Sequence, residues 1–82
     1  MIYKLLTQEI DINSTANNIG GNQIVRVVNV SNANTVLLQK YANGATYASA
    51  SVRGNSEIII TKSPTDLLIG AGQFATAIAY KN

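Results

Sequence analysis

The side chains best suited to acid–base or metal chemistry in this sequence are its four carboxylates, two of which, Glu9 and Asp11, are two positions apart. On a β-strand this spacing places both side chains on the same face. Paired carboxylates can bind a calcium ion or act as a catalytic pair. Only Glu57 and Asp66 remain to complete a ligand set. We therefore interpret the pair as charge on a solvent-facing strand edge, where it discourages sheet-to-sheet aggregation.

The sequence lacks the side chains most often used as catalytic nucleophiles, bases and metal ligands, because it contains no histidine and no cysteine. A serine nucleophile needs a neighbouring base, usually histidine, and none is available to Ser14, Ser49, Ser51 or Ser56. The Gly20-Gly21 pair does not extend into a phosphate-binding motif. We predict that the chain is not an enzyme and that it binds no cofactor and no metal.

Aromatic residues offer a second kind of chemistry, recognition by stacking. Lys40 and Tyr41 lie close to Asn43, a combination that can stack on and hydrogen-bond to a sugar or a nucleotide. Aromatic side chains at strand ends more commonly anchor a core or an interface. We prefer that interpretation for all four tyrosines, Tyr3, Tyr41, Tyr47 and Tyr80. A module that binds glycans or a host surface stays as an alternative, and it requires an exposed cluster of these rings.

The formal charge of +2 and the pI near 9.2 do not predict nucleic-acid binding. Such binding needs several phosphate contacts in one place, whereas the six cations are spread at one per predicted strand or turn.

The N-terminal residues reach Gln8, Glu9 and Asp11 without an apolar region typical of a signal peptide. No apolar run is long enough to cross a bilayer. We expect assembly in a cytoplasm, with neither nucleic acid nor membrane as a partner.

Alternation of apolar and polar residues predicts the elements that carry these side chains. The predicted strands are residues 2–12, 23–30, 35–41, 45–52, 57–62 and 74–80, with an Asn-rich loop at 13–22 and a hairpin at Asn43-Gly44. Strands at this spacing indicate an all-β fold, a small antiparallel β-sandwich or partly open barrel of about six strands. We predict a single domain over residues 1–82, in which residues 1–22 are a candidate inter-subunit arm.

One segment has a different pattern. Ser63 is a suitable N-cap, Pro64 suits the first position of a helix, and Asp66 follows in the first turn. The sequence therefore predicts one short helical turn near residues 64–68, packed on the sheet by Leu67, Leu68 and Ile69.

The composition favours assembly with other chains. Charged residues make up 12% of the chain and hydrophobic residues 46%, while soluble domains average about 25% charged residues. A domain of 82 residues without disulfides gains stability from partners. The predicted interface comprises the first strand and its loop, the alanine face of the last strand and the tyrosines. Its residues are Ile2, Tyr3, Leu5, Ile19, Tyr41, Tyr47, Ala75, Ala77, Ala79 and Tyr80.

From Arg26 onward the order of features resembles a known group of proteins. Arg26–Val30 is followed by a polar turn, an Asn-Gly hairpin, a strand of small residues, the segment Ser56–Lys62, the tripeptide Pro64-Thr65-Asp66 and the strand Ala75–Tyr80. This order resembles small β-proteins of marine tailed bacteriophages, particularly those that infect cyanobacteria. The resemblance implies a structural protein of the virion, most specifically a capsid decoration or cement protein.

The same resemblance leaves a neck, tail or fibre subunit as the alternative. It implies the major capsid protein or other virion proteins as partners, a homo-oligomer, and the virion as the location. It transfers no active-site residues.

Overall fold

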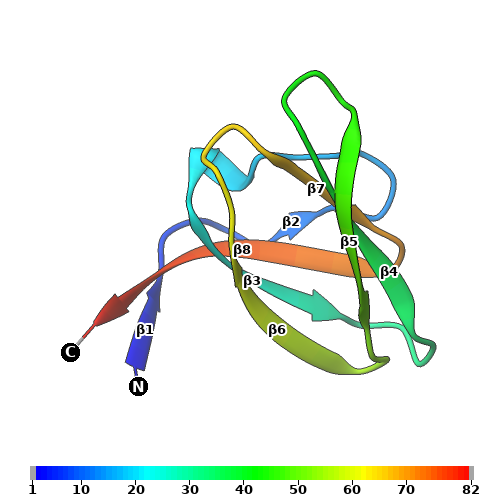
Figure 1. The fold of residues 1–82 in the computed structure, drawn as a ribbon. Helices are drawn as coiled ribbons and strands as arrows, with labels where there is room; N and C mark the ends of the chain where they lie inside the picture. Colours follow the sequence, from blue (N-terminus) through cyan, green and yellow to red (C-terminus); the bar gives the residue numbers. More distant parts are fainter. Residues whose placement is uncertain (1, 82) are drawn as a thin grey trace.

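The computed structural model describes residues 2–81, which form antiparallel β-structure in two sheets (Figure 1). The only helical element in this range is a short 3-10 turn, η1, at Ile19–Gly21. The eight strands are β1 Ile2–Leu5, β2 Ile10–Asp11, β3 Ile24–Asn29, β4 Thr35–Lys40, β5 Thr46–Val52, β6 Ser56–Thr61, β7 Leu67–Gly70 and β8 Gln73–Lys81. The predicted all-β class is confirmed.

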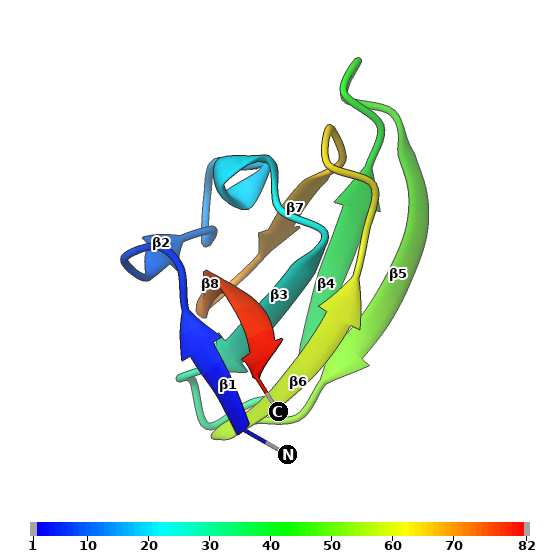
Figure 2. The ribbon, with the colours of Figure 1, turned by 90° about the vertical axis from the view of Figure 1, so that its left-hand side faces the viewer.

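The larger sheet has the order β1-β8-β3-β6, with β2 also paired to β8, and the smaller sheet has the order β5-β4-β7. Figure 2 shows β4 and β5 on one side of the molecule and β1 and β8 on the other. Strand β3 pairs with β6 and β8 in register, Val27 opposite Ile58 and Ala75. The β-branched residues of β3 suit this central place, because they are stiff and pack well on a pleated surface.

The core lies between the two sheets. Alternate residues of β3 and β8 point inward, so Val25, Val27, Ala75 and Ala77 are buried. They meet Leu37, Val52 and Leu68 from the smaller sheet. Ile12 and Ile19, from the N-terminal segment, complete the buried cluster.

Within residues 2–81, the backbone hydrogen bonds that join the two sheets lie along one side. Ile12 donates its N–H to Gln73 O at 3.2 Å and accepts from Gly70 N at 2.9 Å. Asn17 forms a bridge with Leu68 of β7. Residues 12–17 thus cover the outer edge of β7. On the opposite side β5 and β6 are edge strands of different sheets, so the fold is a partly open barrel as much as a sandwich.

The predicted strand at residues 2–12 is two strands, because the chain leaves the sheet between them. Leu6 still donates its N–H to Ala77 O at 2.8 Å. The next ladder position is taken by a side chain, since Ala77 N donates to Thr7 Oγ1 at 3.2 Å. A hydroxyl that replaces a backbone carbonyl lets the chain diverge before it pairs again at Ile10.

The predicted helical turn at residues 64–68 is wrong. Residues 63–66 form a tight turn in which Asp66 N donates to Ser63 O at 3.0 Å. Residues 67–70 then form β7, which pairs with β4. Pro64 suits the second position of such a turn as well as the start of a helix. The side chain of Asp66 does not cap a helix, because it accepts hydrogen bonds from Gln39 and Tyr47. Backbone pairing with β4 makes the residues that follow a strand.

The predicted hairpin between the third and fourth predicted strands is confirmed. It connects β4 and β5 through residues 41–45, with Tyr41 N donating to Ala45 O at 2.9 Å and Gly44 N donating to Tyr41 O at 2.8 Å. Gly44 has a φ of 93°, a conformation that glycine adopts without steric penalty.

Candidate functional site

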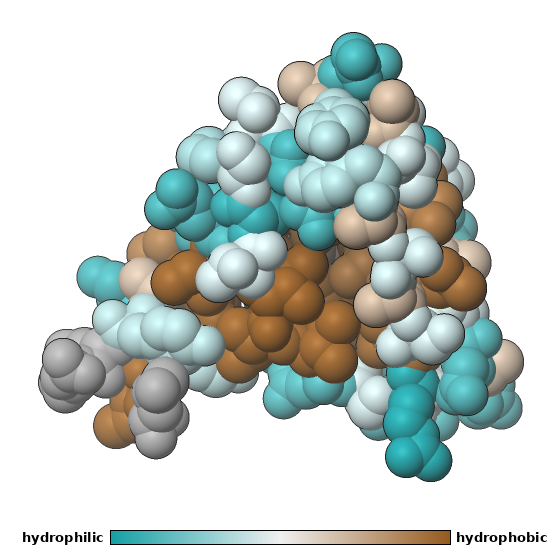
Figure 3. All heavy atoms as spheres, in the orientation of Figure 1, coloured by the Kyte–Doolittle hydropathy of each residue, from teal (hydrophilic) through white to brown (hydrophobic). Residues whose placement is uncertain are grey.

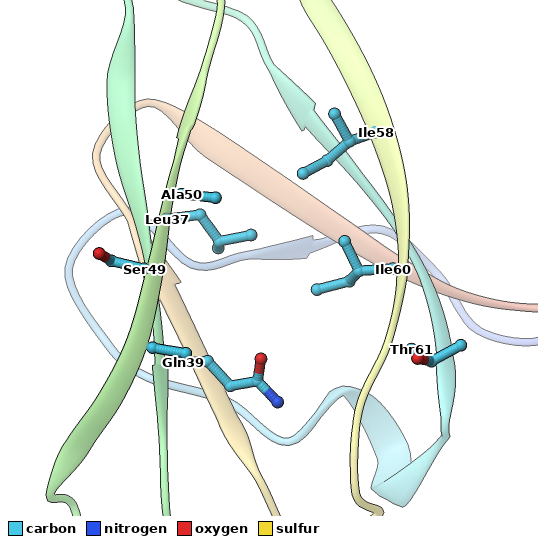
Figure 4. A pocket seen from close by; sticks show the side chains of 8 residues that line it. Leu37, Gln39, Ser49, Ala50, Ile58, Ile60 and Thr61 are labelled. Carbon is cyan, nitrogen blue, oxygen red and sulfur yellow. The ribbon is translucent and has the colours of Figure 1, made fainter.

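An apolar groove opens between the free edges of β5 and β6, with a volume of about 350 Å³. Ile58 and Ile60 point into it from β6, and Leu37, Gln39 and Ala50 face them from the other sheet (Figure 4). Figure 3 shows apolar side chains gathered at the centre of this hollowed face. No charged residue lines the groove in the part of the chain that the structure describes. Its chemistry therefore suits an apolar, uncharged occupant.

The groove is open because the inner face of β5 carries small side chains. Ala48 and Ala50 line it and are both exposed, although they lie opposite Gln39 and Leu37 in the β4 pairing. Large side chains at these two positions would fill the space between the sheets. The chain thus buries only part of its own core on this side.

A two-stranded ribbon projects from the body of the molecule where the chain termini meet (Figure 1). We call it the terminal ribbon; it consists of β1 and residues 78–81 of β8, which pair antiparallel. Beyond Ala77, β8 no longer pairs with β3. Two-stranded ribbons are only marginally stable alone in water.

The terminal ribbon and the residue after β1 expose large apolar side chains. The exposed fractions are 70% for Ile2, 65% for Leu5, 46% for Leu6 and 45% for Tyr80. Single exposed apolar residues are ordinary on a protein surface, but a cluster of them indicates a contact site. This cluster and the groove are the two strongest candidates for a functional surface.

The outer face of the larger sheet carries a three-residue ion cluster. The Arg26 guanidinium is bonded to the Glu57 carboxylate through Nε, and its Nη1 lies 3.6 Å from Glu9 Oε2. Two carboxylates share one cation, so the cluster has a formal charge of −1. The Glu9–Asp11 pair considered as a metal site is divided, because the Asp11 carboxylate instead accepts the N–H of Asn13 at 2.8 Å.

A polar cluster lies at the end of the smaller sheet that carries the β4–β5 hairpin. The buried Asp66 carboxylate accepts hydrogen bonds from the Tyr47 hydroxyl and from Gln39 Nε2, the latter at 2.9 Å. The Tyr47 ring stacks on Tyr41 with a centroid separation of 4.1 Å. Both rings remain about half exposed.

The hydrogen bond from Tyr47 lowers the pKa of Asp66, with smaller contributions from Gln39, the Ser63 backbone and Lys62. The same bond raises the pKa of Tyr47 to about 12, because ionisation would break it beside a negative charge. Burial lowers the pKa of Lys62, and the Asp66 charge opposes that shift. Lys62 Nζ also donates to Ser63 O at 3.2 Å. All the groups have partners, which indicates a structural cluster rather than a reactive one.

The predicted interface residues fall into an exposed and a buried set. Tyr3 and Ala79 are half-buried on the terminal ribbon, and Ile2, Leu5 and Tyr80 are exposed there. Tyr41 and Tyr47 are exposed at the hairpin end, apart from the terminal ribbon. The structure therefore brings the terminal residues together and leaves the two hairpin tyrosines as a separate pair.

Three predicted interface residues are not available as surface. Ala75 and Ala77 are 0% and 1% exposed, because the alanine face of β8 packs in the core of its own chain. Ile19 is 0% exposed and has a φ of 55°, which is rare for a β-branched residue. Its side chain anchors the N-terminal loop in the core rather than offering it to a partner. Flat, small faces suit close packing within one chain as well as between chains.

The sequence reasoning missed the groove. The small residues of β5 are visible in the sequence, and Ala48 and Ala50 do line an opening. The alternation pattern of a strand could not show whether its small residues are covered by another part of the same chain or border an open groove.

Within residues 2–81 there is no group of three or more histidine, cysteine, aspartate or glutamate side chains placed to hold a metal ion. No helix in that range has the length and hydropathy needed to span a bilayer. Comparison of the chain with protein-family models, with curated proteins and with solved structures finds no match.

Proposed function

We propose that this chain is a non-enzymatic structural subunit of a virion, most specifically a decoration or cement protein that stabilises a capsid shell. One observation carries the proposal: the terminal ribbon and the adjacent Leu6 present apolar side chains to solvent at 45–70% exposure, those of Ile2, Leu5, Leu6 and Tyr80. A free strand edge bordered by apolar side chains favours pairing with another chain.

Three further features support this role. The groove offers a second apolar surface on the same molecule. Charged residues are 12% of the chain, so surface contacts with a neighbour require little desolvation of charge. The polar cluster at Asp66 has its hydrogen bonds satisfied, as expected for a scaffold. The partners would be the major capsid protein or other virion proteins, and many weak contacts would add through multivalency.

The test is whether the purified protein binds to capsid shells of the same virus that were prepared without this protein. We expect saturable co-sedimentation and a higher temperature of shell disruption. A decoration protein saturates at copy numbers on the order of hundreds, whereas a neck, tail or fibre subunit is present at about six to a few dozen copies. A protein that neither binds shells nor occurs in purified particles would contradict both versions.

A second candidate function is glycan binding at the hairpin end, favoured by the exposed stack of Tyr41 on Tyr47. A sugar ring can lie against such an aromatic face while nearby amides donate hydrogen bonds. A glycan array probed with the wild type and with Tyr41→Ser tests it; Tyr80→Ser is the matched control, since Tyr80 is exposed to a similar degree elsewhere. Binding lost only in Tyr41→Ser would support this function.

A further inference from the structure

We propose that the terminal ribbon of one copy docks along the free edge of β6 in a second copy and inserts Leu5 into the apolar groove of that copy. The inference rests on the proposed function in one respect, since it takes the chain to be a structural subunit. It names a second copy of this chain as the occupant of the groove.

The groove and the terminal ribbon match in their apolar character. Ile58 and Ile60 line the groove from β6, and Leu37, Ala48 and Ala50 line it from the smaller sheet. The terminal ribbon exposes Leu5 at 65%, and Tyr3 lies on the same face of β1. Leu5 and Tyr3 are large enough to fill the space that Ala48 and Ala50 leave open in the groove.

The strand edges match as well. Strands β1 and β6 each end the larger sheet, so each has one edge without a partner strand within residues 2–81. The four residues of β1 span about 13 Å and fit along the six residues of β6. Pairing of the two edges extends the sheet from one copy into the next.

Charge sets which face of β1 turns inward. Lys4 is exposed on β1, and residues 2–6 and 78–81 contain no carboxylate. Glu57 on the outer face of β6 shares Arg26 with Glu9, which leaves the formal charge of −1 described above. When Lys4 faces this cluster, alternation along the strand directs Tyr3 and Leu5 toward the groove.

The occupant must come from another molecule. In both Figure 1 and Figure 2, β6 lies between the terminal ribbon and β5, so β6 separates the ribbon from the groove that β5 and β6 border in the same chain. Donor and acceptor surfaces are therefore different surfaces of one molecule. Such a head-to-tail contact builds a closed ring or an open filament.

The experiment measures self-association of the full-length chain by sedimentation velocity over a range of concentrations. Leu5→Asp disables the donor ribbon and Ala50→Phe fills the acceptor groove. Each should weaken association at least about tenfold. Val36→Ser is the matched control, because Val36 is 50% exposed on the outer face of β4 and should leave association unchanged. Circular dichroism verifies that each variant is folded. If Leu5→Asp or Ala50→Phe does not fold, the milder substitutions Leu5→Ser and Ala50→Leu are measured instead.

Mixing the two disabled variants gives the decisive result. Leu5→Asp retains an intact groove and Ala50→Phe an intact ribbon, so their equimolar mixture should form a heterodimer and stop there. A wild type that remains monomeric at every concentration overturns the inference, as does a mixture that fails to dimerise. An isologous contact between two ribbons would abolish association in Leu5→Asp but leave Ala50→Phe unaffected.

Shell binding separates this inference from the proposed function. If the wild type is monomeric yet binds shells through Leu5, the ribbon docks on a shell protein; the inference is then wrong and the proposed function stands. If the chain forms rings or filaments but neither binds shells nor occurs in particles, the proposed function is wrong and the inference about self-association stands.

Discussion

At the scale of single residues, the buried polar side chains hold the two sheets together. Asn29, 0% exposed on β3, donates to Val52 O of β5 at 3.0 Å and to Ala33 O at 2.9 Å. Asp66, in the turn that leads from β6 of the larger sheet to β7, binds Gln39 of β4 and Tyr47 of β5 and so anchors this turn to the smaller sheet. Loss of a partner in such a group leaves the remaining polar atom unsatisfied, which is more costly than the bond itself is favourable.

The Asp66 cluster predicts a pH-dependent stability. The pKa of Asp66 is lowered in the folded state, chiefly by the hydrogen bond from Tyr47. The stabilisation is therefore fully present above the unfolded pKa of about 3.9 and is lost as the pH falls through the lower folded value. Tyr47→Phe should lower the free energy of unfolding at pH 7, and this deficit should shrink as the pH falls below about 3.9.

Urea unfolding at a series of pH values measures this difference. Tyr80→Phe is the control, since the hydroxyl of Tyr80 belongs to an exposed side chain on the terminal ribbon. An equal deficit for Tyr47→Phe at every pH would show that the hydrogen bond does not act through the Asp66 charge.

At the scale of elements, β7 depends on a glycine. A Cβ on Gly70 would lie 2.5 Å from Cδ of Gln73, whose side chain crosses the backbone of β7. Gln73 is 0% exposed and donates from Nε2 to Thr35 Oγ1 at 2.7 Å. The strand can approach this buried amide because residue 70 has no side chain.

Gly70→Ala should therefore destabilise the fold by about 1–3 kcal/mol, the usual effect of overpacking a filled interior. For a domain of this size each kcal/mol lowers the Tm by about 4–8 °C. Ala71→Ser, at the exposed neighbouring position, should change stability by less than about 0.5 kcal/mol. Calorimetry compares the two, and equal Tm values would mean that Gln73 moves aside freely.

At the scale of the whole molecule, the barrel is held firmly on one side and open on the other. Residues 12–17 join β8 to β7 through backbone hydrogen bonds. Strand β3 is paired on both of its edges, whereas β5 and β6 each have one edge that is not paired in the described chain. The molecule thus combines a central strand that is paired on both edges with outer strands whose edges are suited to contact.

This arrangement predicts a gradient of hydrogen exchange. Amides of β3 and of residues 73–77 should exchange slowest, near the rate set by global unfolding, and those of β1 and β5 fastest. Exchange followed by mass spectrometry or NMR at low protein concentration measures it. Slow exchange along the whole of β5 at that concentration would contradict an open edge there.

The local sequence pattern is enough to predict the all-β class, most strand positions and the Asn-Gly hairpin. These depend on local periodicity and turn chemistry, which adjacent residues carry. It also placed Ile2 and Leu5 in a candidate interface; the structure leaves both side chains exposed, and their contact with a partner stays a prediction.

What each strand packs against depends on the complete fold. Local pattern favoured a helix at residues 64–68, but the available edge of β4 made residues 67–70 a strand. The alanines of β8 and those of β5 look alike in sequence; Ala75 and Ala77 lie in the core, while Ala48 and Ala50 border an open groove. The difference depends on contacts between residues far apart in the chain, and burial of a flat face depends on the partner that reaches it.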